Sequence, residues 1–141
     1  MRYFLILTIT LWTGLSYAGE VEVEMLNKLN NEHMVYSKKI VKIDVGDTVF
    51  WKATDSSHNV EFIKGAIPEG VEAFKSKLSK DVSYKFKIPG IYAYWCTPHK
   101  SLGMIGFVIV GNDLSNKESI SNVKYFGKSK KIAEQLIEQL I

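Results

Sequence analysis

Four side chains of this sequence could together bind a metal ion. Cys96, His99 and Met104 lie within nine residues of one another, and His58 stands in a polar loop earlier in the chain. A thiolate, two imidazoles and a thioether favour copper, because sulfur ligands suit Cu(I) and imidazole suits both oxidation states. Zinc gains little from a thioether, and hard cations require oxygen ligands. The pattern therefore predicts a copper site.

Each of these residues also has a plain structural interpretation. Taken alone, Cys96 could be a small buried hydrophobic residue, Met104 a core side chain and His58 a loop histidine. The third histidine, His33, lies in a polar run without a partner nearby in sequence, and we interpret it as a surface residue. Export of the protein would favour the interpretation of Cys96 as a metal ligand. A lone thiol in an oxidising compartment tends to form a disulfide, and metal ligation is one way to keep it unpaired.

The N-terminal segment predicts such export. A short positive start at residues 1–2 precedes an apolar run over residues 3–15, and Ser16-Tyr17-Ala18 places small residues where a signal peptidase cleaves. The apolar run is short for a membrane span of about 20 residues, and an uncleaved anchor is the alternative. We therefore expect a signal peptide over residues 1–18, a single domain over residues 19–141, and no membrane insertion after cleavage.

Composition sets outer limits on function. The 141 residues suffice for one ordinary domain, and 46% hydrophobic with 23% charged residues is typical of a globular protein. The formal net charge of +3 is far below the dense basic surface that neutralises many phosphates, so we expect no nucleic-acid partner. A single cysteine excludes a disulfide framework within the chain and a zinc site built on paired cysteines.

The segments that must position the four side chains are mostly strand-like. Apolar residues alternate with polar ones, or form short continuous runs, over residues 20–25, 41–45, 48–53, 82–88, 91–96 and 105–110. Many short strands separated by turn signals predict an all-β sandwich of two sheets. Cys96 and Met104 then lie at the ends of two apolar strands, with His99 in the turn between them.

Three segments depart from the strand pattern. Residues 68–78 have a mixed apolar spacing that fits a short helix on a connecting loop. Residues 115–118, Ser-Asn-Lys-Glu, resemble a capping box at the start of a helix. Ile132, Leu136 and Leu140 recur every four residues, which predicts an amphipathic helix whose apolar stripe covers a sheet. We therefore expect a C-terminal pair of α-helices.

The ligand segment resembles that of the blue-copper cupredoxins. It reads Cys-Thr-Pro-His at 96–99, with a methionine five residues after the histidine, a spacing similar to plastocyanin and pseudoazurin. The whole mature chain is similar to the pseudoazurins, including the two-helix tail. The shared stretches are Val-Glu-Met-Leu-Asn-Lys at 23–28, Gly-Asp-Thr-Val at 46–49, His-Asn-Val-Glu at 58–61, Ile-Pro-Glu-Gly at 67–70 and Phe-Lys-Ser-Lys at 74–77.

This resemblance implies a cupredoxin-like Greek-key sandwich that holds one type 1 copper ion per chain. The implied ligands are His58, Cys96, His99 and Met104, with Met104 as the long axial ligand. The resemblance also implies that three neighbours, Asn59, Thr97 and Pro98, surround these ligands.

The chain departs from the family around the site. Members often have methionine where this chain has Leu102, and lysine where it has Ser56 and Trp95. These departures leave the ligand set intact and bear on the docking surface.

Four protein ligands leave no open coordination position, which favours electron transfer over catalysis. The family implies a monomeric single-electron carrier in a bacterial periplasm, between a c-type cytochrome donor and nitrite reductase or a similar terminal reductase. A copper chaperone or storage protein is the alternative, because soft ligands also suit Cu(I) delivery. A two-copper enzyme lacks histidines for its second site, and a binuclear centre lacks its second cysteine. A metal-free interaction module would tolerate loss of Cys96.

An electron would leave through His99, which lies on a turn among apolar residues. The expected contact patch holds Pro98, Leu102 and Gly103 and, by family analogy, Ile67 and Pro68. Lysines around such a patch would speed the approach of an acidic partner, less so at high salt. The lysines that we expect to take part are Lys28, Lys64, Lys75, Lys77 and Lys100.

Overall fold

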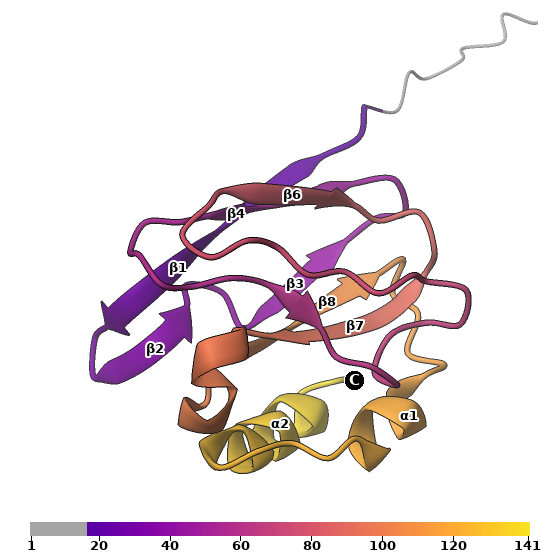
Figure 1. The fold of residues 1–141 in the computed structure, drawn as a ribbon. Coiled ribbons are helices and arrows are strands. Elements are labelled where there is room, and N and C mark those ends of the chain that lie inside the picture. The colour runs from indigo at the N-terminus through magenta and orange to yellow at the C-terminus, as the bar shows by residue number, and fades with distance from the viewer. Residues whose placement is uncertain (1–16) are drawn as a thin grey trace, which may run out of the picture.

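The computed structural model describes residues 17–141. Most of the predicted signal peptide, residues 1–16, lies outside this described part. Within it, two four-stranded sheets pack face to face (Figure 1). The first sheet has the order β2-β1-β4-β6 and the second β3-β8-β7-β5. The strands are β1 Glu20–Leu29, β2 Glu32–Tyr36, β3 Ile40–Ile43, β4 Thr48–Lys52, β5 Glu61–Phe62, β6 Val82–Lys85, β7 Gly90–Trp95 and β8 Ile105–Val110.

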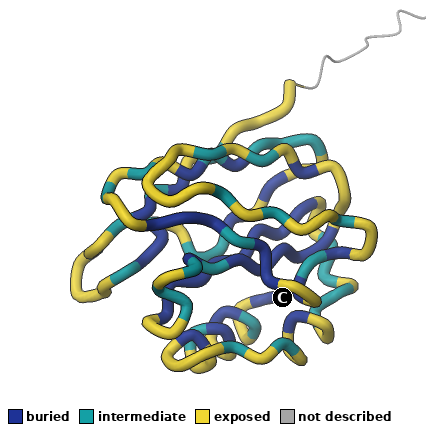
Figure 2. Tube along the Cα trace, viewed as in Figure 1, coloured by how far each residue is buried: buried dark blue, intermediate teal, exposed yellow. Residues whose placement is uncertain are grey.

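Both sheets are mixed. Strand β1 pairs with β4 in parallel, and β3 pairs with β8 in parallel, whereas the other neighbours are antiparallel. The arrangement confirms the predicted two-sheet sandwich. Its inner layer is built from alternate residues of the strands, such as Val23 and Met25 of β1, and from aromatic side chains that include Trp51 and Phe86. Figure 2 shows this buried layer as the dark core of the trace.

A second apolar layer lies between β7–β8 and the C-terminal helices. Helices α1 (Lys117–Asn122) and α2 (Lys128–Glu138) cover the outer face of the second sheet (Figure 1). Leu136 and Leu140 are buried there against Ile91 and Phe107. Strands β7 and β8 are therefore covered on both faces, which explains their continuous apolar sequences. No helix within residues 17–141 is long and apolar enough to cross a membrane.

The predicted helix over residues 68–78 is wrong. This segment is an extended loop that lies beside β5: the backbone N–H of Phe62 donates to the carbonyl of Phe74 at 2.9 Å, and Lys75 forms a β-bridge with Glu61. Val71 and Phe74 pack against the inner core. The apolar spacing thus reflects burial, but the backbone hydrogen bonds go to a strand instead of closing helical turns.

The predicted capping box is also wrong. The backbone N–H of Ser115 donates to the Asp113 carboxylate at 2.8 Å, and Asn116 stands at the N-cap without a side-chain capping bond. The Asn116 side chain instead bonds the backbone N–H and carbonyl of Ile91, at 2.9 and 2.8 Å. It therefore ties the start of α1 to β7.

The start of α2 packs on the short 3-10 helix η1 (Thr97–Leu102), which follows β7. The Ser129 hydroxyl donates to the backbone carbonyl of Lys100. Gly127, at the N-cap of α2, lies so close to Ser101 that a side chain would overlap the Ser101 carbonyl group. The helical tail thus contacts the segment that carries His99.

This contact predicts an unusual sensitivity at Gly127. Its φ of +52° and ψ of −128° disfavour other residues, and an added Cβ would also displace Ser101. We expect Gly127→Ala to lower the free energy of unfolding of the metal-free protein by about 2–5 kcal/mol in urea. The matched control is Gly46→Ala, where φ is +98° and nothing lies within 4 Å of the added Cβ, with an expected loss of about 1–3 kcal/mol. Equal losses would contradict the packing of α2 on η1.

Candidate metal centre

Three of the predicted ligands converge at one end of the sandwich. His58 follows β4, Cys96 follows β7, and His99 lies in η1. The Cys96 sulfur is 3.7 Å from Nδ1 of His58 and 3.4 Å from Nδ1 of His99, and the two Nδ1 atoms are 3.1 Å apart. The structure therefore brings together donor atoms from two segments of the chain.

The size of this triangle fits a metal ion. A point equidistant from three atoms at these separations lies about 2 Å from each, close to the length of a metal–imidazole bond. His58 and Cys96 are fully buried, and one thiolate with two imidazoles is a donor set suited to copper.

Met104 lies beside the triangle through its backbone. The Cys96 N–H donates to the Met104 carbonyl at 2.9 Å, and the Met104 N–H donates to the His99 carbonyl at 3.3 Å. The Met104 side chain is fully buried in the same core cluster as Cys96. These bonds close the ligand loop, and the axial role of the thioether stays a prediction.

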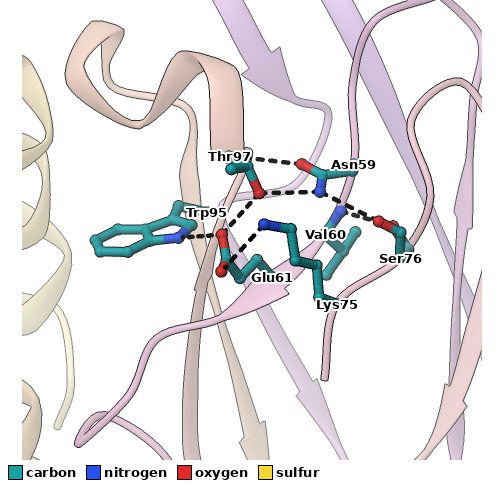
Figure 3. Close-up of polar contacts among 7 residues, drawn as sticks. All are labelled: Asn59, Val60, Glu61, Lys75, Ser76, Trp95 and Thr97. Atoms are coloured by element: carbon teal, nitrogen blue, oxygen red, sulfur yellow. Dashed lines mark hydrogen bonds and ion pairs between the residues drawn. The ribbon is translucent and has the colours of Figure 1, made fainter. Parts of the chain in front are cut away.

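Asn59 joins the two segments that carry the ligands, and Figure 3 shows its contacts with Thr97. The Asn59 amide accepts from the Thr97 backbone N–H at 2.8 Å and donates to the Thr97 hydroxyl at 2.9 Å. The backbone carbonyl of Asn59 accepts a hydrogen bond from the buried Tyr36 hydroxyl at 2.7 Å. Because His58 precedes Asn59 and Cys96 precedes Thr97, these bonds hold the two ligands in register.

Two polar residues near the site had no role in the sequence analysis. Asn27 of β1 places its side-chain oxygen 2.9 Å from Nε2 of His58. With Nε2 as donor in this bond, Nδ1 keeps its lone pair and faces the triangle. Glu61 of β5 accepts hydrogen bonds from Trp95 and Thr97, on either side of Cys96. Both residues lie in the stretches shared with the pseudoazurins, which was the one available signal.

Burial shifts the pKa of each of the three side chains in the cluster. It lowers the pKa of His58, with a further contribution from His99, and it lowers the pKa of His99. Both imidazoles are therefore neutral at neutral pH and offer lone pairs. Burial raises the pKa of the Cys96 thiol, although the backbone amides of Asn59 and His99 donate to the sulfur and oppose the rise. Metal binding must then displace the thiol proton.

The expected contact patch is only partly assembled. Pro98 is exposed, Leu102 is 46% exposed, and His99 is half-buried beside them, whereas Gly103 is buried. Ile67 and Pro68 do not flank His99. A Cβ on Gly90, at the start of β7, would meet the Pro68 ring at 2.6 Å, while Cys96 follows the end of that strand.

The correction for Ile67 and Pro68 has a simple physical cause. The chain after β5 runs antiparallel to β7. The backbone N–H of Ile63 donates to the Ala93 carbonyl, and the backbone N–H of Ala93 donates to the Ala66 carbonyl, both at 2.9 Å. From Phe62 to Ala66 the chain therefore moves away from Cys96 and towards the Gly90 end of β7.

The lysines predicted to steer docking differ in their exposure and in the contacts that restrain their side chains. Lys28, Lys64, Lys75 and Lys77 are exposed, and Lys100 is half-buried. The Lys75 ammonium lies 3.6 Å from Glu61. The Lys100 ammonium lies 5.0 Å from the Trp95 ring centre and 4.9 Å from that of Phe126, so cation–π contacts restrain it. His33 is exposed, as predicted.

Comparisons with known proteins agree with this geometry. The family described as "Copper binding proteins, plastocyanin/azurin family" matches residues 23–111. A pseudoazurin of Paracoccus pantotrophus is 38% identical over 124 residues, which cover 88% of this chain and 86% of the relative.

Solved structures are similar as well. A pseudoazurin from Sinorhizobium meliloti superposes with a TM-score of 0.83 at 38% identity, covering 86% of this chain and 96% of that one. The pseudoazurin of Methylobacterium extorquens AM1 gives a TM-score of 0.83 at 34% identity, with 86% and 99% covered. The sandwich, the helical tail and the His-Cys-His cluster thus occur together in a chain that belongs to the plastocyanin/azurin family of copper-binding proteins and, within it, to the pseudoazurins.

Proposed function

We propose that this protein carries single electrons between redox partners, with one copper ion bound by His58, Cys96, His99 and Met104. As a pseudoazurin it is a blue-copper electron-transfer protein and not an enzyme. The observation that carries the ligand assignment is the cluster of His58, Cys96 and His99, whose donor atoms lie within 4.8 Å of one another. Bound copper supplies a one-electron change between Cu(II) and Cu(I).

The residues around the cluster suit a carrier because they resist rearrangement. Cys96 and Met104 are anchored at the ends of two strands that are buried on both faces, and packed interiors do not deform continuously. Asn27 and Asn59 fix His58 and its backbone from two sides. A site that hardly changes shape between oxidation states costs little reorganisation when an electron arrives or leaves.

The location and partners belong to the same proposal. Residues 1–18 have the features of a signal peptide, which supports transfer to the periplasm, and residues 19–141 would then work there as a single monomeric domain. Pro98 and Leu102 expose apolar surface beside His99, which supports brief contact with a redox protein. A c-type cytochrome donor and a nitrite reductase or similar acceptor fit this role.

Copper titration of the metal-free protein tests the ligand assignment. We expect an intense visible thiolate-to-copper absorption that saturates at one equivalent of Cu(II), because the triangle accepts one ion. Cys96→Ser should abolish the band, and the control His33→Ala, at an exposed histidine, should keep it. A colourless protein that holds Cu(I) and releases it readily to a chelator would favour the chaperone or storage role instead.

Met104→Leu tests the axial thioether. The variant should keep copper and show a higher reduction potential in a redox titration, because a hydrocarbon side chain in place of the axial donor removes electron donation that stabilises the more highly charged Cu(II). Met25→Leu is the matched control, since Met25 is equally buried in the inner core. An unaltered potential in Met104→Leu would exclude Met104 as the axial ligand.

Electron-transfer kinetics test the docking surface. We expect Leu102→Ala to slow the second-order reaction with a purified copper nitrite reductase at every salt concentration. Lys28→Gln should slow it at low salt only, because a Debye length of about 10 Å at 0.1 M screens exposed charges. Lys85→Gln is the control, since Lys85 is exposed at the end of β6 that pairs with Thr48. Equal effects of the two lysine variants would contradict steering by Lys28.

A further inference from the structure

One carboxylate oxygen holds both neighbours of Cys96 in the chain. Oε2 of Glu61 accepts a hydrogen bond from the indole Nε1 of Trp95 at 3.1 Å and another from the hydroxyl of Thr97 at 2.6 Å (Figure 3). Glu61 lies on β5 directly opposite Trp95 of β7. The other oxygen, Oε1, is 3.6 Å from the Lys75 ammonium. The residues before and after the cysteine therefore share one anionic acceptor.

The hydrogen bonds around Thr97 have a defined direction. The Asn59 amide group donates to the Thr97 hydroxyl oxygen at 2.9 Å, so the hydroxyl proton is free to point at Glu61. An ionised acceptor strengthens the bond that it receives, and polarisation of the hydroxyl makes its oxygen a better acceptor for Asn59. The charge on Glu61 thus reinforces the Asn59–Thr97 contact that joins the two ligand segments.

Glu61 is ionised at neutral pH. Partial burial opposes the charge, but hydrogen bonds from Thr97 and Trp95 and the charge of Lys75 outweigh it and lower the pKa of Glu61. The exposed Lys75 balances this charge only in part, because exposed ion pairs are weak. A negative charge therefore remains close to the ligand loop.

We propose that Glu61 is a positioning residue for Cys96, which holds Trp95 and Thr97 on either side of the sulfur-bearing residue and biases the site electrostatically towards Cu(II). The proposal rests on the copper-carrying function proposed above. Its charge component predicts a direction, since a nearby anion favours the more positive oxidation state and so lowers the reduction potential. Its geometric component predicts a change in the cysteine–copper absorption when the hydrogen bonds are lost.

Glu61→Gln separates these effects from a purely structural role, because glutamine keeps the shape and removes the charge. We expect a higher reduction potential and a shifted thiolate-to-copper band. In the metal-free protein we expect the Trp95 indole N–H signal to move in NMR spectra. Lys75→Met should shift the potential in the opposite direction and leave the indole signal near its original position. Lys77→Met, at an exposed lysine two residues away, should change the potential less than Lys75→Met.

The outcomes distinguish the alternatives. Wild-type potential and absorption in Glu61→Gln, with only a loss of stability, would overturn the proposal and leave Glu61 as a structural link between β5 and β7. If Glu61→Gln does not fold, Trp95→Phe removes one hydrogen bond and keeps the charge. A wild-type absorption band in that variant would also overturn the proposal. Absence of the band from the wild-type protein would refute the proposed electron-carrying copper site. The indole signal of the metal-free protein tests the hydrogen bond between Trp95 and Glu61 independently of copper.

Discussion

The contact between Asn59 and Thr97 is the constraint on which the rest of the site depends. These residues are 38 positions apart, and each directly follows a side chain of the donor cluster. One amide both accepts from the Thr97 backbone and donates to its hydroxyl, so the loop after β4 cannot slide along the end of β7. The imidazole of His58 and the sulfur of Cys96 are therefore held facing each other, 3.7 Å apart.

The sandwich and the C-terminal helix α2 both support the ligand loop. Two buried strands, β7 and β8, anchor the ends of the ligand loop, and α2 contacts the loop from outside through Ser129 and Gly127. A loop held at both ends and along its back has little freedom to change shape. Such rigidity suits a carrier whose metal gains and loses an electron repeatedly, and the contact of α2 with the loop adds to it.

Much of this arrangement could be predicted from residue patterns, and the failures have physical causes. Alternating and continuous apolar runs located six of the eight strands described within residues 17–141. Strand β2 was missed because its apolar residues do not alternate and Met34 interrupts it with a φ of +52°, and β5 was missed because it has only two residues. The helix predicted over residues 68–78 was wrong because the spacing of Val71 and Phe74 indicates only that these side chains are buried, and buried side chains can belong to a helix or to an extended loop. Asn27 and Glu61 act through contacts with residues 31 and 36 positions away, and such partners are set by tertiary packing.

Anomalous diffraction at the copper absorption edge, from crystals of the copper-loaded protein, tests the central claim most directly. We predict one strong peak per chain, surrounded by Nδ1 of His58, the sulfur of Cys96 and Nδ1 of His99, with the Met104 sulfur at a longer distance. A copper peak elsewhere, for example at His33, with none inside the triangle, would contradict the account.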